Sequence, residues 1–286
     1  MSNKVSPLLP GSENAAEAQA QKKQERIKAM RQKQKMQEAS KICNEDIMQY
    51  GLIWEKVLQE QGAALEELEG FVATLKGTMP DPKTVRQPPM EDAPDPTDSD
   101  YLELLKMEFE AVDERIFAEA AAAAAAQGLE FHPGPPKKDE RALEKADLAY
   151  GNDFALLKDL RRASIVCPDI ASMVRLIKHM ADGKASGLSL VRVKNRFDRK
   201  FKAKDESAGY RDIQFSVLTA QGLIWELQVH LVDIEELKTK LRDQADSSGR
   251  TGHQRYVAYR QIKERLDVAG GGGGGGGGDG GGGGGG

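Results

Sequence analysis

The chain has 286 residues, of which 39% are hydrophobic and 30% are charged, and its formal net charge is −4. No apolar run approaches the roughly 20 residues of a membrane span, and the N-terminus lacks the apolar segment of a secretory signal. Two cysteines far apart, Cys43 and Cys167, exclude a disulfide scaffold or a cysteine-based zinc site. We therefore expect a protein of the cytoplasm or of another reducing compartment.

Residues 1–44 form a basic arm rich in Ala, Gln, Lys and Arg, with few apolar side chains to bury. Helix propensity is high, but no wide apolar stripe is present, so the arm is predicted to be helical or disordered. Two interpretations stay open. The arm is a solvated lead-in, or it is a basic segment that binds RNA or a membrane surface.

Residues 45–131 are predicted to be a helical region with an acidic balance. Apolar residues from Trp54 to Leu75 are spaced for one face of a helix over 45–76, with Gly77 as its stop. A Pro- and Asp-rich linker covers 80–100, and Asp100 is the expected cap of a second helix over 101–127 that ends in seven alanines. These two helices need a partner in their own chain, in another protein or in a second copy.

Residues 137–268 are predicted to alternate short helices with strands, unlike the helical region before them. The predicted helices cover 137–149, 169–182, 233–244 and 251–266, and the predicted strands cover 162–167, 189–197, 210–219 and 223–231. This order predicts an α+β domain whose mixed, largely antiparallel sheet is flanked by helices. The Gly-rich tail over 269–286 has no side chains to bury and is expected to be disordered.

Three successive strands each offer one apolar and one polar face. In the last of them, Glu226, Gln228 and His230 alternate with apolar residues, while basic residues gather on the strand over 189–197 and in the loop that follows it. A sheet that is wetted on one side would account for this alternation. The other interpretation is a phosphate site, in which cations hold phosphates and carboxylates hold Mg²⁺.

Five short motifs follow one another within residues 137–266. They are Asp159–Val166, Lys194–Phe197, Gly209–Ile213, Glu226–Val229 and His253–Tyr256. In this order they resemble the synthetase domain of the RelA/SpoT family of alarmone synthetases, which has a nucleotidyltransferase fold. Helices stand where long family members carry a hydrolase domain, so no such domain is expected in this part of the chain.

The resemblance implies transfer of a pyrophosphate from ATP to the 3′-hydroxyl of GDP, GTP or a related acceptor. It implies that Asp159 and Glu226 are catalytic and hold Mg²⁺, that Glu226 helps to activate the hydroxyl, and that Tyr210 stacks on the guanine. Further nucleotide-binding residues implied by the resemblance are Arg141, Lys145, Arg161, Lys194, Arg196, Gln228 and His253.

The sequence also departs from the family pattern. Ser164 stands in place of an Arg, Asn195 in place of an Asp, and Gln214 near the usual position of a His. A second function therefore stays open: a catalytically inactive domain of the same fold that binds a nucleotide or RNA, with a helical N-terminus that binds a partner. Asp159 as a capping residue, Tyr210 as an ordinary strand aromatic and His253 as a structural residue are open as well.

Overall fold

The computed structural model describes residues 22–24, 26–27, 30, 34, 37, 41–90, 92–245 and 249–270. Most of the basic arm, and the Gly tail beyond residue 270, lie outside the described residues. The described residues form an α+β fold around a five-stranded sheet in the order β1-β2-β5-β4-β3, which confirms the predicted fold class. The strands are β1 (Glu130–Pro133), β2 (Arg162–Cys167), β3 (Ser189–Asn195), β4 (Ile213–Leu218) and β5 (Ile224–Leu231). Only β2 and β5 pair in parallel among these strands.

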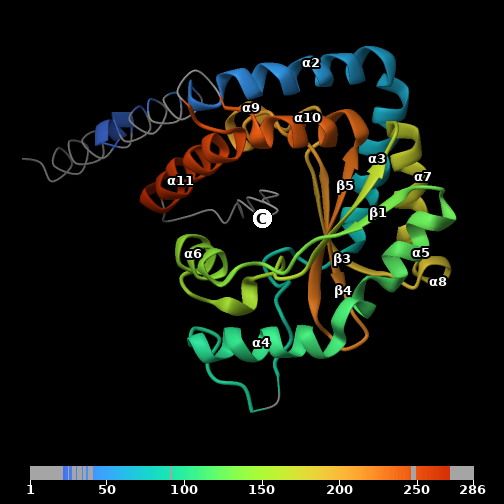
Figure 1. Ribbon diagram of the computed structural model, residues 1–286, viewed down its shortest axis with the longest axis vertical. Helices are drawn as coiled ribbons and strands as arrows, with labels where there is room; N and C mark the ends of the chain where they lie inside the picture. Colours follow the sequence, from blue (N-terminus) through green and yellow to red (C-terminus); the bar gives the residue numbers. More distant parts are fainter. Residues whose placement is uncertain are drawn as a thin grey trace, which may run out of the picture.

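Helices cover both faces of the sheet. Figure 1 shows α3, α5, α7 and α8 on one side, α6, α10 and α11 on the other, and α2 lying across α10. The helices are α2 (Asn44–Glu60), α3 (Gly62–Thr78), α4 (Ser99–Val112), α5 (Ala118–Ala126), α6 (Asp139–Tyr150), α7 (Ile170–Ala181), α8 (Gly183–Ser186), α9 (Ala203–Glu206), α10 (Val232–Asp243) and α11 (Gly252–Gly270), with 3-10 turns η1 (Asp113–Phe117) and η2 (Phe154–Leu156). No described helix is long and apolar enough to cross a bilayer.

The single helix predicted over 45–76 is two helices, α2 and α3. The break is at Gln61, whose backbone leaves helical geometry and whose Oε1 accepts a hydrogen bond from the backbone N–H of Ile170 at 2.7 Å. The apolar stripe therefore splits. Leu65 and Leu68 are buried on α3, whereas Leu58 on α2 is 40% exposed.

The second predicted helix is also divided, into α4, η1 and α5. Its cap is Asp98, two residues before the predicted Asp100, because the Asp98 carboxylate accepts a hydrogen bond from the backbone N–H of Asp100. The alanine run is part of the core, since Ala120 and Ala124 are fully buried and α5 packs against α7 and α8. Small side chains let these helices approach closely.

The linker predicted over 80–100 is not a free spacer, because Gln87 packs against the folded part of the chain. Gln87 is 1% exposed, and its amide donates to the carbonyls of Leu157 and Ile224, at 2.7 Å each, and accepts from the N–H of Ile224 at 2.9 Å. The linker thus covers the start of β5.

Strand β1 was not predicted from the sequence, where residues 130–133 fall at the end of the helical region and just beyond it. It pairs antiparallel with β2 at the edge of the sheet, and Pro133 is its last residue. Proline lacks an N–H donor and is tolerated in such an edge position. β1 extends the sheet past β2 and borders the site described next.

Candidate functional site

The polar side chains of the strands form rows across one face of the sheet. Gln228 of β5 lies opposite Ser164 of β2 and Gln214 of β4, and Gln214 lies opposite Lys194 of β3. The centre of this face is covered, because Gln228 is only 6% exposed and Gln214 only 3%, whereas Ser164 and Lys194 on the neighbouring strands are half-buried. A sheet wetted on one side does not account for the two buried glutamines. They belong to the floor of a site.

A cavity of about 390 Å³ lies over this floor. Its walls come from the end of β1, from β2 and β5, and from α2, α10 and α11. The lining residues that carry the chemistry are Tyr50, Arg162, Tyr210, Gln228, Glu235 and Lys238. The cavity combines aromatic rings, cations and hydrogen-bonding groups, which is the usual composition of a small-molecule site.

Asp159 lies just before β2, three residues from the cavity-lining Arg162, and is 1% exposed. Its Oδ2 is 2.6 Å from the Nζ of Lys137 and 3.2 Å from the Nζ of Lys145. Burial alone would raise the pKa of Asp159, but the two ammonium groups lower it well below its ordinary value, so this side chain is a carboxylate at neutral pH. Its Oδ1 is buried and has no hydrogen-bond partner.

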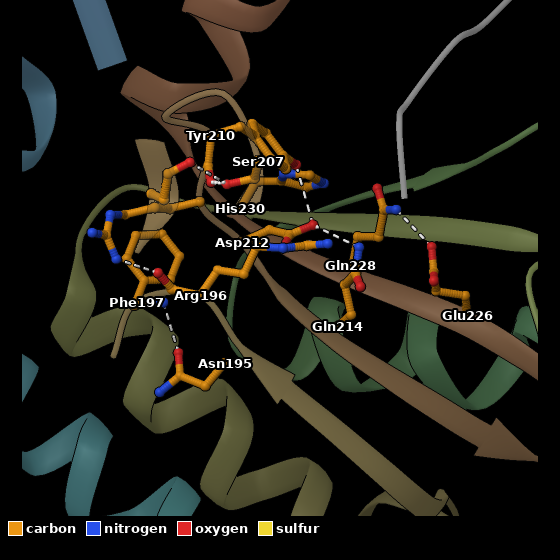
Figure 2. Close-up of polar contacts among 12 residues, drawn as sticks. Asn195, Arg196, Phe197, Ser207, Tyr210, Asp212, Gln214, Glu226, Gln228 and His230 are labelled. Atoms are coloured by element: carbon orange, nitrogen blue, oxygen red, sulfur yellow. Dashed lines mark hydrogen bonds and ion pairs between the residues drawn. The ribbon is translucent and has the colours of Figure 1, made fainter. Parts of the chain in front are cut away.

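Glu226 is the second carboxylate and lies at the same end of the sheet. The parallel register places it opposite Arg162, and its backbone N–H donates to the carbonyl of Arg161 at 3.1 Å. Burial and the nearby charge of Asp159 raise the pKa of Glu226. Its Oε1 accepts a hydrogen bond from the Nε2 of Gln228 at 2.7 Å (Figure 2).

The two carboxylates fit a divalent cation that is completed by a ligand. Among the described residues no three His, Cys, Asp or Glu side chains converge as a protein-only metal site. Mg²⁺ is commonly held by one or two carboxylates together with water and substrate phosphates. Oδ1 of Asp159 has no hydrogen-bond partner and the charge of Asp159 acts on Glu226, so these two carboxylates are the residues that could hold such a cation.

Tyr210 lines the cavity and belongs to a buried polar network (Figure 2). Its hydroxyl is 2.9 Å from the Nδ1 of His230 and donates to Oδ2 of Asp212 at 3.3 Å. Asp212 also forms a buried ion pair with Arg196. Burial, followed by the charge of Lys238, lowers the pKa of His230 to about 3, so the ring is neutral at physiological pH. The network fixes the Tyr210 ring against the cavity.

The predicted site residues do not all reach this site. Asp159, Glu226 and Lys145 lie together, and Tyr210 and Gln228 line the cavity. Arg141 pairs with Glu144, and Arg161 lies over the ring of Phe117. Lys194 lies on β3 opposite Gln214, and Arg196 is 2% exposed and paired with Asp212. The side chain of His253 lies outside the described residues.

Sequence reasoning missed two cations, Lys137 and Arg162. Lys137 is the first residue of the helix predicted over 137–149, and its backbone N–H donates to the carbonyl of Leu160 at 2.9 Å, which places its side chain beside Asp159. Arg162 starts β2 and shares the polar face with Ser164. Strand alternation, applied to residues 162–167 as it was to 223–231, would have selected Arg162 over Arg161.

The departures from the family pattern have local explanations. Asn195 accepts a hydrogen bond from the N–H of Phe197 at 2.9 Å, a turn-forming contact at the end of β3. Gln214 donates to Asp212 at 3.2 Å and so extends the network below Tyr210. Ser164 is in the cavity floor, where it leaves space that an arginine would fill.

No family model and no curated protein matches the chain. Similar solved structures include small alarmone synthetase 1 from Bacillus subtilis bound to its product pppGpp, with 16% identity, a TM-score of 0.40, and coverage of 60% of this chain and 98% of that one. The chain resembles small alarmone synthetases. A GTP pyrophosphokinase family protein from Streptococcus pneumoniae is 16% identical over 59% of this chain and 91% of that one, with a TM-score of 0.35.

The type VI effector Tas1, solved in complex with its immunity protein, is 21% identical over 56% of this chain and 74% of that one, with a TM-score of 0.36.

Proposed function

We propose that the protein is a Mg²⁺-dependent pyrophosphotransferase that moves pyrophosphate from ATP to the 3′-hydroxyl of a guanine nucleotide. The observation that carries the proposal is the buried carboxylate pair of Asp159 and Glu226, with Lys137, Lys145 and Arg162 around it. Phosphoryl chemistry needs carboxylates for the metal and cations for the phosphates, and catalysis is mostly positioning and charge stabilisation.

The proposed reaction joins the acceptor's 3′-oxygen to the β-phosphorus of ATP. The bond between that phosphorus and the α,β-bridging oxygen breaks, and AMP leaves. The hydroxyl proton passes to Glu226, whose raised pKa makes it a stronger base than an ordinary glutamate. Mg²⁺, when bound by Asp159 and Glu226, would neutralise charge on the transferred group.

Tyr210 supports a nucleotide as the acceptor. Its ring lines the cavity, and the Nζ of Lys238 is 6.0 Å from the ring centroid. A base can stack on an aromatic ring, and a nearby ammonium favours an anionic ligand. Guanine as the base is the expectation that follows from the sequence resemblance.

One observation favours a second function, a nucleotide- or RNA-binding domain without turnover. Oδ2 of Asp159 already contacts two ammonium groups, Lys137 at 2.6 Å and Lys145 at 3.2 Å. If these contacts persist when a nucleotide is bound, they neutralise the carboxylate and compete with a cation. The cavity would then hold its ligand without transfer.

The test uses the full chain, because α2 lines the cavity. The protein is incubated with Mg²⁺, γ-³²P-labelled ATP and either GDP, GTP or ADP, and the products are resolved by thin-layer chromatography. Glu226→Gln is expected to lower the rate by about 100-fold or more, as loss of a general base does. Glu236→Gln, the same substitution at an exposed position on α10, is the matched control.

A labelled product that requires Glu226 and a guanine acceptor supports the proposal. Unchanged turnover in Glu226→Gln would refute the catalytic assignment. No product with any acceptor, from a chain that still binds nucleotide, would select the second function.

A further inference from the structure

The cavity is not built by the sheet and its neighbouring helices alone. Asp46 and Tyr50 on α2 line it, as does Cys43 just before the helix, and α2 precedes the sheet by about 70 residues of sequence. Tyr256 of α11 packs with Cys43 and Ile47 and lines the same cavity. Part of the site therefore comes from a helix that sequence reasoning assigned to a separate region for partner binding.

A buried bidentate ion pair holds α2 in place. Arg255 of α11 donates from Nε to Oδ2 of Asp46 at 2.9 Å and from Nη2 to Oδ1 at 2.6 Å. Both side chains are buried, with 3% exposure for Arg255 and 5% for Asp46. Paired hydrogen bonds of this geometry fix orientation as well as distance. The pair therefore sets where the first turns of α2 lie.

A second contact fixes α2 against the loop before β4. Gly209 adopts a φ of +89°, and a Cβ added there would lie 3.1 Å from both Cα of Ile47 and Cβ of Tyr50. Only a glycine combines this backbone conformation with so close an approach. The residue next to Gly209 is Tyr210, so α2 is held directly beside the aromatic ring of the candidate site.

Tyr50 presents its ring to the aromatic end of the cavity. It meets the ring of Tyr210 edge to face, with centroids 5.9 Å apart and planes at 80°. Burial raises the pKa of Tyr50, and the charges of Asp46 and Glu235, which also line the cavity, raise it further. Tyr50 and Tyr210 thus form a corner of two rings.

This corner lies further along β5 than the carboxylates. On β5, Glu226 is opposite Arg162, and His230, four residues later, contacts Tyr210. At about 3.3 Å per residue these two points are roughly 13 Å apart along the strand. A nucleotide placed with its phosphates towards Arg162 would have its base in the corner of Tyr50 and Tyr210.

We propose that α2 is part of the ligand site: Tyr50 binds the base of the nucleotide together with Tyr210, and the Asp46–Arg255 ion pair positions Tyr50. The inference rests on the proposed function only for the class of ligand, a nucleotide. It assigns to the N-terminal helix a role in binding and none in the transfer step.

The first test measures binding by calorimetry with the full chain, using GDP and, separately, α,β-methylene-ATP, which cannot react. Tyr50→Ala is expected to raise the dissociation constant of at least one nucleotide by about tenfold or more, the usual effect of removing a stacking ring. Tyr50→Phe keeps the ring and is expected to restore binding to within about threefold. Leu52 on α2 is 66% exposed, and Leu52→Ala is the control, which should bind both nucleotides as the wild type does.

The second test addresses the ion pair through Asp46→Asn, which keeps the shape of the side chain and one acceptor. In the transfer assay this variant is expected to raise KM by about tenfold and to leave kcat within about twofold, because binding is uniformly weakened. A thermal melt of each variant confirms that it is folded. If Asp46→Asn does not fold, Tyr50→Ala and Tyr50→Phe decide the question alone.

The outcomes separate this inference from the proposed function. A chain that binds nucleotide through Tyr50 but transfers nothing would overturn the proposed reaction and leave the inference standing. Wild-type affinity for both nucleotides in Tyr50→Ala would overturn the inference, whatever the activity. Failure of the wild-type chain to bind either nucleotide would overturn both.

Discussion

The two carboxylates of the site should respond to neutralisation in opposite directions. Asp159→Asn removes the carboxylate that lies 2.6 Å from Nζ of Lys137 and 3.2 Å from Nζ of Lys145, and the two lysine side chains are only 10% and 11% exposed. Removing one partner from a buried ion pair costs about 3–5 kcal/mol, because a buried charge is left uncompensated. Since an asparagine oxygen can still accept one hydrogen bond, we expect a loss of about 3 kcal/mol in the free energy of unfolding.

Glu226→Gln should behave differently. Burial and the charge of Asp159 raise the pKa of Glu226, so its ionised form is less favourable in the folded protein than in the unfolded chain at pH 7. The neutral side chain removes that repulsion and can keep the contact with Gln228. We expect no loss of stability and a gain of up to about 1 kcal/mol.

The measurement is urea unfolding at pH 7, followed by the fluorescence of Trp54 and Trp225, without nucleotide and with a chelator present. Asp147→Asn, an exposed position on α6, is the control and should stay within about 0.5 kcal/mol of the wild type. Wild-type stability in Asp159→Asn, or an equal loss in Glu226→Gln, would refute this account of the site's electrostatics. Wild-type stability in Asp159→Asn would also mean that other groups compensate the charges of Lys137 and Lys145.

Two further predictions concern buried polar groups outside the carboxylate pair. The pKa of His230 is about 3 in the folded protein, below its value in the unfolded chain, so between these two values the unfolded chain binds one more proton and the free energy of unfolding rises with pH. His230→Gln should therefore reduce the slope of the free energy of unfolding against pH by about 1.4 kcal/mol per pH unit between pH 4 and 6. Equal slopes for the variant and the wild type would contradict this prediction. Gln87→Ala removes three buried hydrogen bonds to backbone groups of Leu157 and Ile224 and should cost about 3 kcal/mol in urea unfolding, whereas a cost below about 1 kcal/mol would show that the linker is dispensable.

Local patterns in the sequence determined four of the five strands, β2 to β5, and their order. The run Arg162–Cys167 is β2 as predicted, and the alternation over 223–231 placed Glu226, Gln228 and His230 on one face. Side chains alternate along a strand whatever surrounds it, so the sequence alone identifies the two faces. The five motifs likewise selected Asp159 and Glu226, which the structure brings together.

What covers each face was decided only by tertiary contacts. Gln61 ends α2 because its side chain binds the start of α7, far away in sequence, and the alanine run is buried because α7 and α8 pack on it. The same holds for the site. Tyr50 of α2 lines the cavity, and Asp46 on the same helix pairs with Arg255, 209 residues away in the sequence. Hydrophobic periodicity predicts which side of a helix or strand is apolar. Whether that side is buried depends on segments far away in the sequence, which a local pattern does not identify.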